Sequence, residues 1–86
     1  MSKVVIHRDA AKYLNRLPED SRNRIKALLK ELENRAIDQQ GVKPMLGEWA
    51  GYHRLRAGKF RIIFWFNDRD DIVYVDHIGP RGDIYK

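Results

Sequence analysis

The chain has 86 residues and no cysteine, and its 17 Lys and Arg against 12 Asp and Glu give a formal net charge of +5. This length suits one domain over residues 1–86, and the lack of cysteine excludes a disulfide framework and a thiolate metal site. The longest apolar run, Ile62 to Phe66, is far short of the roughly 20 residues that span a bilayer, and no export signal is visible. We therefore expect a soluble cytoplasmic protein without a membrane partner. Its positive charge favours polyanions such as nucleic acid.

The first half of the chain predicts a strand followed by two helices. The β-branched residues at 3–6 favour a short strand. Apolar residues at helical spacing predict a first helix that begins near Asp9 and ends before Pro18, and a longer second helix after Glu19. The apolar face of the second helix consists of Ile25, Leu28, Leu29, Leu32 and Ala36. Both helices therefore present one side to a core.

The second half predicts a sheet. Residues 42–50, which contain Pro44 and Gly47, are expected to form an ordered loop. After it the apolar period changes to two, which predicts strands at 52–57, 60–67 and 72–78. The expected fold is α+β: a short N-terminal strand, a two-helix hairpin and a three-strand antiparallel meander, with the helices packed on one face of the sheet.

A two-residue turn at Gly58-Lys59 would pair Arg56 with Arg61. Side chains alternate across a strand, so this pairing predicts that Leu55, Phe60, Ile62 and Phe64 face the core. The opposite face would carry Tyr52, Arg54, Arg56, Arg61 and Trp65. Like charges directly opposite each other are destabilising, which indicates that this face has a use for them.

Arginines beside aromatics suit single-stranded RNA, because guanidinium groups match phosphate oxygens and aromatic rings stack on unpaired bases. The alternative is a solvated face whose arginines pair with Glu48, Asp76 or Asp83. The pattern alone leaves both interpretations open. Gly79, Pro80 and Gly82 would allow Arg81 to return to this face, but the C-terminal tail could equally only pack Tyr85 on the core.

No familiar catalytic motif occurs in the sequence. The three histidines, His7, His53 and His77, lack metal-ligand spacing, so we expect neither a metal nor a cofactor. His53 should point to the opposite side of its strand from Arg54. Any RNA cleavage would then depend on arginine and tyrosine.

The segments 52–64 and 71–85 resemble the RelE-like toxins of the RelE/ParE superfamily. Three features of the first half are also typical of this superfamily: the leading strand, the helix at residues 9–14 and the Leu17-Pro18-Glu19 junction. The resemblance therefore spans nearly the whole chain. Each segment is short and degenerate, and their order and spacing carry the resemblance.

The resemblance implies an mRNA interferase: an endoribonuclease that enters the A site of the 70S ribosome, cuts mRNA by attack of a 2′-OH on the adjacent phosphate, and is held inactive by a cognate RelB-like antitoxin. The catalytic positions of such toxins fall on Arg54, Arg61, Arg81 and Tyr85. The residues expected to bind RNA beside them are Tyr52, Arg56, Lys59 and Trp65.

Two departures from the family pattern concern the general base. Some relatives carry lysines on the first meander strand and a histidine at the C-terminus, and both are missing here. Tyr85, the substrate or a ribosomal group is then the candidate base, because arginine stays protonated. Two other functions stay open: a ParE-like toxin that inhibits DNA gyrase without cutting RNA, and a non-catalytic nucleic-acid-binding module. A gyrase inhibitor would not need the set Arg61, Arg81 and Tyr85.

Overall fold

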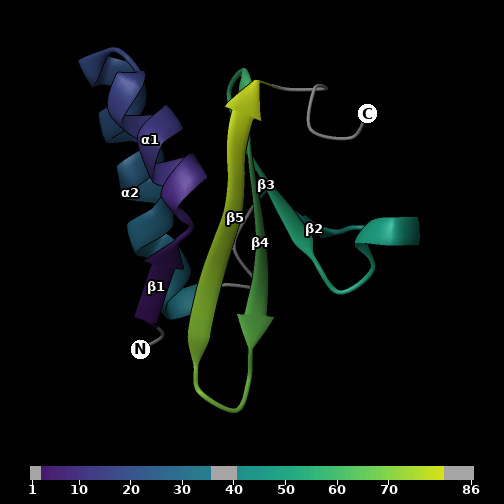
Figure 1. Cartoon of the computed structure of the whole chain (residues 1–86). Coiled ribbons are helices and arrows are strands. Elements are labelled where there is room, and N and C mark those ends of the chain that lie inside the picture. Colours follow the sequence, from purple (N-terminus) through teal and green to yellow (C-terminus); the bar gives the residue numbers. More distant parts are fainter. Residues whose placement is uncertain (1–2, 36–40, 81–86) are drawn as a thin grey trace.

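The protein is seen in a computed structural model that describes residues 3–35 and 41–80 (Figure 1). Its elements are β1 (Lys3–Ile6), α1 (Arg8–Arg16), α2 (Glu19–Arg35), β2 (Val42–Pro44), a single 3₁₀ turn η1 (Gly47–Trp49), β3 (His53–Ala57), β4 (Phe60–Asn67) and β5 (Ile72–Pro80). The strands form one sheet in the order β1-β5-β4-β3-β2, in which only β1 runs parallel to its neighbour. The expected α+β fold is confirmed.

The meander has four strands rather than the expected three, because residues 42–44 pair with β3. Val42 lies opposite Leu55 and Lys43 opposite Arg54. So short a strand carries too little alternation to be recognised in the sequence, and Pro44 lacks the N–H of a ladder donor. Its position on an edge strand accommodates that loss. Figure 1 shows β2 and η1 at the edge of the sheet far from β1.

The helix boundaries follow from local chemistry. His7 caps α1, where its Nδ1 accepts a hydrogen bond from the Asp9 N–H at 3.1 Å. Leu17 is extended because the α conformation is disfavoured before a proline, so α1 ends at Arg16. Glu19 and Asp20 then open α2 with negative charge at its N-terminus, which the helix dipole favours. Ala36, expected on the apolar face of this helix, lies outside the described residues.

The core lies between the two helices and one face of the sheet, and Figure 1 shows both helices on that side. The largest side chains that are fully buried in it are Ile25, Leu32, Leu55, Ile62, Phe64, Val73 and Val75. The predicted inward set of the hairpin is therefore confirmed. Neither helix of the described chain has the length and apolar character that crossing a membrane requires.

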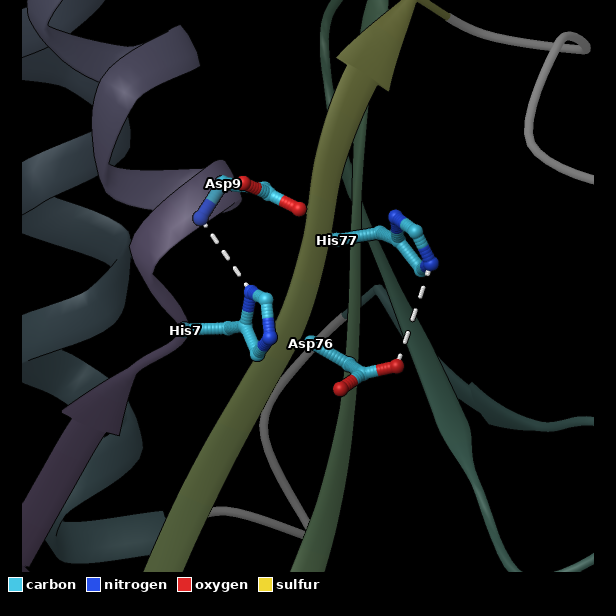
Figure 2. A network of polar contacts seen from close by, with 4 residues as sticks. All are labelled: His7, Asp9, Asp76 and His77. Atoms are coloured by element: carbon cyan, nitrogen blue, oxygen red, sulfur yellow. Dashed lines mark hydrogen bonds and ion pairs between the residues drawn. The ribbon is translucent and has the colours of Figure 1, made fainter.

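A β-bulge in β5 keeps its apolar residues on the core side. Ile63 pairs with His77 and Phe64 with Val75, so Asp76 is an extra residue without a partner on β4. The extra residue shifts the alternation, and Ile78 is buried together with Val75. Figure 2 shows Asp76 and His77 side by side, where a carboxylate oxygen of Asp76 lies 3.8 Å from Nε2 of His77.

The face of the sheet that is turned away from the helices has cations directly opposite one another. Arg56 faces Arg61 across β3 and β4, as the hairpin pairing predicts, and Lys43 faces Arg54 across β2 and β3. Gly58 adopts φ +63°, which a two-residue hairpin turn needs at its first position and which a side chain would resist. The turn therefore holds the register that opposes these charges.

We expect Leu32→Ala to lower the free energy of unfolding by about 2–5 kcal/mol, because the side chain is fully buried and its removal leaves a cavity. Urea denaturation measures this loss. Leu46→Ala is the matched control: the same atoms are removed from a residue that is 86% exposed, and a change within about 0.5 kcal/mol is expected. Equal losses in the two variants would contradict the position of the core.

We expect Arg56→Gln to raise the free energy of unfolding by about 0.2–1 kcal/mol in dilute salt, because it removes the like-charge pair with Arg61 and keeps most of the side-chain volume. The gain should vanish near 1 M salt, where the Debye length falls to about 3 Å. Urea denaturation at the two salt concentrations tests this. A gain of equal size at both would assign the effect to packing rather than to charge.

Candidate nucleic-acid interface

A cavity of about 100 Å³ opens on the face of the sheet that is turned away from the helices. Its lining residues are Gly41, Lys43, Arg54, Arg56 and Arg61, and we call it the cationic cavity. The four charged side chains come from β2, β3 and β4. Cross-strand pairing brings them together, because residues directly opposite on adjacent strands share a face.

Within residues 3–35 and 41–80, no acidic side chain lines the cationic cavity. Arg54 and Arg56 make no ion pair with any described residue. Of the acidic partners that a merely solvated face would require, Asp76 contacts His77, and Glu48 is exposed on η1 without an ion pair to another described side chain. Asp83 lies outside the described residues. Among the described residues, no carboxylate therefore compensates the charges of Arg54 and Arg56.

Such a cavity is suited to a phosphate group. Guanidinium groups donate paired hydrogen bonds in the fixed geometry that phosphate oxygens accept. Donors held in place before the substrate arrives also stabilise negative charge that develops on a phosphate during a reaction. The positive charges of this site are those of Lys43, Arg54, Arg56 and Arg61.

The other predicted site residues lie at different places. Trp65 is on the same face of the sheet as the arginines, but it lies toward the opposite end of β4 from Arg61. Its ring stacks on that of Tyr74, with the ring centres 4.4 Å apart. Lys59 sits in the β3–β4 turn, with its Nζ 5.5 Å from the centre of the Phe60 ring. Tyr52 packs edge-on against Trp49. None of the three lines the cationic cavity, and their contact with RNA stays a prediction.

Three predictions concern residues beyond the hairpin face. His53 stacks on Phe64 with ring centres 5.6 Å apart, on the core side of β3, so its predicted orientation away from Arg54 is confirmed. Its Nδ1 is buried without a hydrogen-bond partner among the described residues. Arg81 and Tyr85, both expected to be catalytic, lie outside the described residues, which end at Pro80.

The segment between β2 and β3 contains a second hollow that the sequence does not reveal. It has a volume of about 250 Å³, and we call it the loop cavity. Its lining residues are Pro44, Met45, Leu46, Trp49 and Arg54. Lys43 was not predicted as a site residue, because the whole segment 42–50 was expected to be a loop. The available signal was a tryptophan and a leucine in a polar, glycine-containing segment.

Comparison with solved structures places the fold among toxins. The RelE–RelB complex of the archaeon Pyrococcus horikoshii contains a chain that is 26% identical, with a TM-score of 0.82, and the match covers 95% of this chain and 97% of that one. The E. coli RelBE toxin–antitoxin complex matches at 18% identity and TM-score 0.75, over 93% and 96% of the two chains. YafQ from E. coli matches at 15% identity and TM-score 0.75 over the full length of both.

The family comparison covers nearly the whole chain. The model of the ParE toxin of the type II toxin–antitoxin system parDE matches residues 4–85. No curated protein matches the chain. The matched range includes both described helices, β1 from Val4 onward, the other four described strands and the cationic cavity. The chain is therefore a toxin of a type II toxin–antitoxin system: it belongs to the ParE toxin family, within the RelE/ParE superfamily that its sequence resembles.

Proposed function

We propose that this toxin is a ribosome-dependent endoribonuclease that cuts mRNA in the A site and so inhibits translation. The observation that carries the proposal is the cationic cavity, which the side chains of Lys43, Arg54, Arg56 and Arg61 line together. Two cross-strand pairs of like charge each cost stability, and a bound phosphodiester would relieve both. Its action takes place in the cytoplasm, where ribosomes and mRNA are found.

The proposed reaction is an in-line displacement at one phosphate. The 2′-oxygen bonds to phosphorus and loses its proton, the bond from phosphorus to the 5′-oxygen breaks, and the products are a 2′,3′-cyclic phosphate and a 5′-hydroxyl. Arg61 and Arg54 hold the non-bridging oxygens and stabilise the charge that builds on them. Arg56 lies opposite Arg61 at the exposed side of the cavity and neutralises a neighbouring phosphate.

Proton transfer is assigned to the C-terminal residues. Arg81 donates a proton to the leaving 5′-oxygen, and Tyr85, the substrate itself or a ribosomal group accepts the proton of the 2′-OH. The described chain offers no better base near the cavity, because His53 lies on the other side of β3 and His77 contacts Asp76. Dependence on a ribosomal group would explain why a chain without a histidine at the cavity acts only on the ribosome.

A RelB-like antitoxin is the proposed partner that holds the toxin inactive. Two of the similar structures are complexes of RelE with RelB, from P. horikoshii and from E. coli. An antitoxin that covered the cationic cavity with acidic side chains would compete directly with mRNA, since both are anionic.

Inhibition of DNA gyrase is the second candidate function. The family that matches this chain is that of the ParE toxin. ParE-like and RelE-like toxins share one fold. This candidate does not require Arg61 to contact a scissile phosphate. The support for the ribonuclease is that three arginines line one cavity and that guanidinium groups match the geometry of phosphate oxygens.

We expect Arg61→Ala and Arg81→Ala each to lower the rate of mRNA cleavage by about 10² to 10³-fold, the usual effect of removing one preorganised donor. Primer extension on mRNA from growing bacteria that express each variant would map the cuts. The wild type should give 5′ ends in phase with codons. Intact mRNA together with DNA-damage signalling in the wild type would favour gyrase inhibition instead.

Arg69→Ala is the matched control for these variants, because Arg69 is an exposed arginine in the β4–β5 turn, beyond the far end of β4 from Arg61. It should retain the cleavage pattern of the wild type. A fully active Arg61→Ala variant would overturn the role of Arg61. A fully active Arg81→Ala variant would overturn only the assignment of the proton donor.

We also expect the logarithm of the RNA association constant to fall linearly with the logarithm of salt concentration, because bound phosphates release counterions. Arg54→Gln should make this slope shallower by about 0.7–1, the contribution of one phosphate contact. Fluorescence anisotropy with a non-cleavable 2′-O-methyl RNA measures it. Lys30→Gln, on exposed α2 surface, should leave the slope unchanged; equal effects of the two substitutions would show that charge alone, and not the cavity, binds RNA.

A further inference from the structure

Arg54 is shared by two cavities of different chemistry. On one side it lines the cationic cavity with Lys43, Arg56 and Arg61. On the other it lines the loop cavity, whose remaining side chains are apolar: Pro44, Met45, Leu46 and Trp49. A phosphate site and an apolar hollow are therefore neighbours, separated by a single guanidinium group. Single-stranded nucleic acid has the same alternation, with a charged backbone beside each flat base.

The walls of the loop cavity are held in place before any ligand binds. Trp49 packs edge-on against Tyr52, with ring centres 5.3 Å apart, and against His77 of β5, with ring centres 5.8 Å apart. These two contacts fix its ring. Met45 is 8% exposed, and its N–H donates a hydrogen bond to the Tyr52 carbonyl at 2.9 Å, which closes the loop. An aromatic wall fixed in this way loses little entropy when a ligand stacks on it.

Leu46, unlike Met45, is a wall residue of the loop cavity that the described chain leaves exposed. It is 86% exposed and is the one large hydrophobic residue that is exposed among the described residues. It lies at the rim of the loop cavity, next to a fixed tryptophan, where covering it would bury apolar surface on binding. Nothing in the packing of the described chain requires a leucine at this position.

We propose that the loop cavity binds one unpaired base of the RNA whose phosphate occupies the cationic cavity. The base stacks on Trp49 and is covered from the other side by Leu46, while Arg54 contacts the adjoining phosphate. This inference rests on the proposed ribonuclease function and extends it, since it makes the β2–β3 loop a determinant of which nucleotides are accepted. Apart from the indole N–H of Trp49, the described walls carry no uncharged hydrogen-bonding side chain. The loop therefore selects mainly by stacking area, and purines bind more tightly than pyrimidines.

The size of the hollow favours a base over a peptide. At about 250 Å³ it is smaller than the usual pocket for a drug-sized ligand, and a single flat ring suits it. A bound helix would need apolar anchors along several turns of a groove. The loop offers Leu46 as its one exposed large apolar side chain, and the cationic cavity directly beside it interrupts any apolar track.

The test compares two short, non-cleavable 2′-O-methyl phosphodiester strands in fluorescence anisotropy at low salt. One is abasic throughout, and the other carries a single adenine. The adenine should tighten binding to the wild type about tenfold, within the range measured for stacking of one base on an aromatic side chain. In Trp49→Ala the adenine should gain less than about twofold. Trp49→Phe, which keeps an aromatic ring, should retain most of the gain, and cytosine should gain less than adenine.

Leu46→Ala guards against a change of fold, because a side chain that is 86% exposed is not needed for packing. It should lose a part of the adenine gain and keep the affinity for the abasic strand. An adenine gain that survives in Trp49→Ala would overturn the assignment and move the base to another aromatic, such as the Trp65 and Tyr74 pair.

The remaining outcomes separate this inference from the proposed function. Salt-sensitive binding of both strands with no adenine gain would overturn the base site alone and leave the phosphate site intact. Failure of both strands to bind at low salt would overturn both proposals. A short acidic peptide with one leucine that binds the wild type but not Trp49→Ala, together with no adenine gain, would assign the loop cavity to a protein partner and overturn the base site.

Discussion

The alternation of side chains along the β3–β4 hairpin joins the core of this protein to its charged face. Leu55 and Ile62 point toward the helices, so Arg54, Arg56 and Arg61 must point away from them. Full burial of one such apolar side chain is worth about 1.5–3 kcal/mol, whereas an opposed pair of like charges costs about 0.2–1 kcal/mol. The core therefore dominates, and it holds the arginines together against their repulsion. A slip of one residue would exchange the two sets and bury the guanidinium groups.

This arrangement links stability and function through the same strands. Charges that oppose each other in the free protein are available to an anionic ligand, and binding removes the repulsion that the fold tolerates. The cost is small enough for a chain of 86 residues, whose margin of stability is limited by the size of its core. The β-bulge at Asp76 has a related effect, because it directs that carboxylate to His77 and none of the described carboxylates enters the cationic cavity.

The edge strand β2 and the loop after it add a lysine and an apolar wall to the arginines of the β3–β4 hairpin. β2 brings Lys43 opposite Arg54, and the loop that follows carries Met45, Leu46 and Trp49 to the other side of the same arginine. Charge and apolar surface thus meet at one residue on an edge strand. An edge is also where a strand of three residues is tolerated, since only one neighbour has to be satisfied. Differences in this loop between related toxins would change the apolar hollow without disturbing the core.

The sequence by itself determined the fold class, both helices, the hairpin register and the side of the sheet on which Arg54, Arg56 and Arg61 lie, because these follow from local periodicity, a proline and a glycine turn. Only the tertiary structure decided the rest. The pairing of β2, the bulge at Asp76, the separation of Trp65 from the arginines and the packing of Trp49 on His77 all depend on contacts between segments distant in the chain. Local patterns carry no information about such contacts, and the two cavities around Arg54 are built from them.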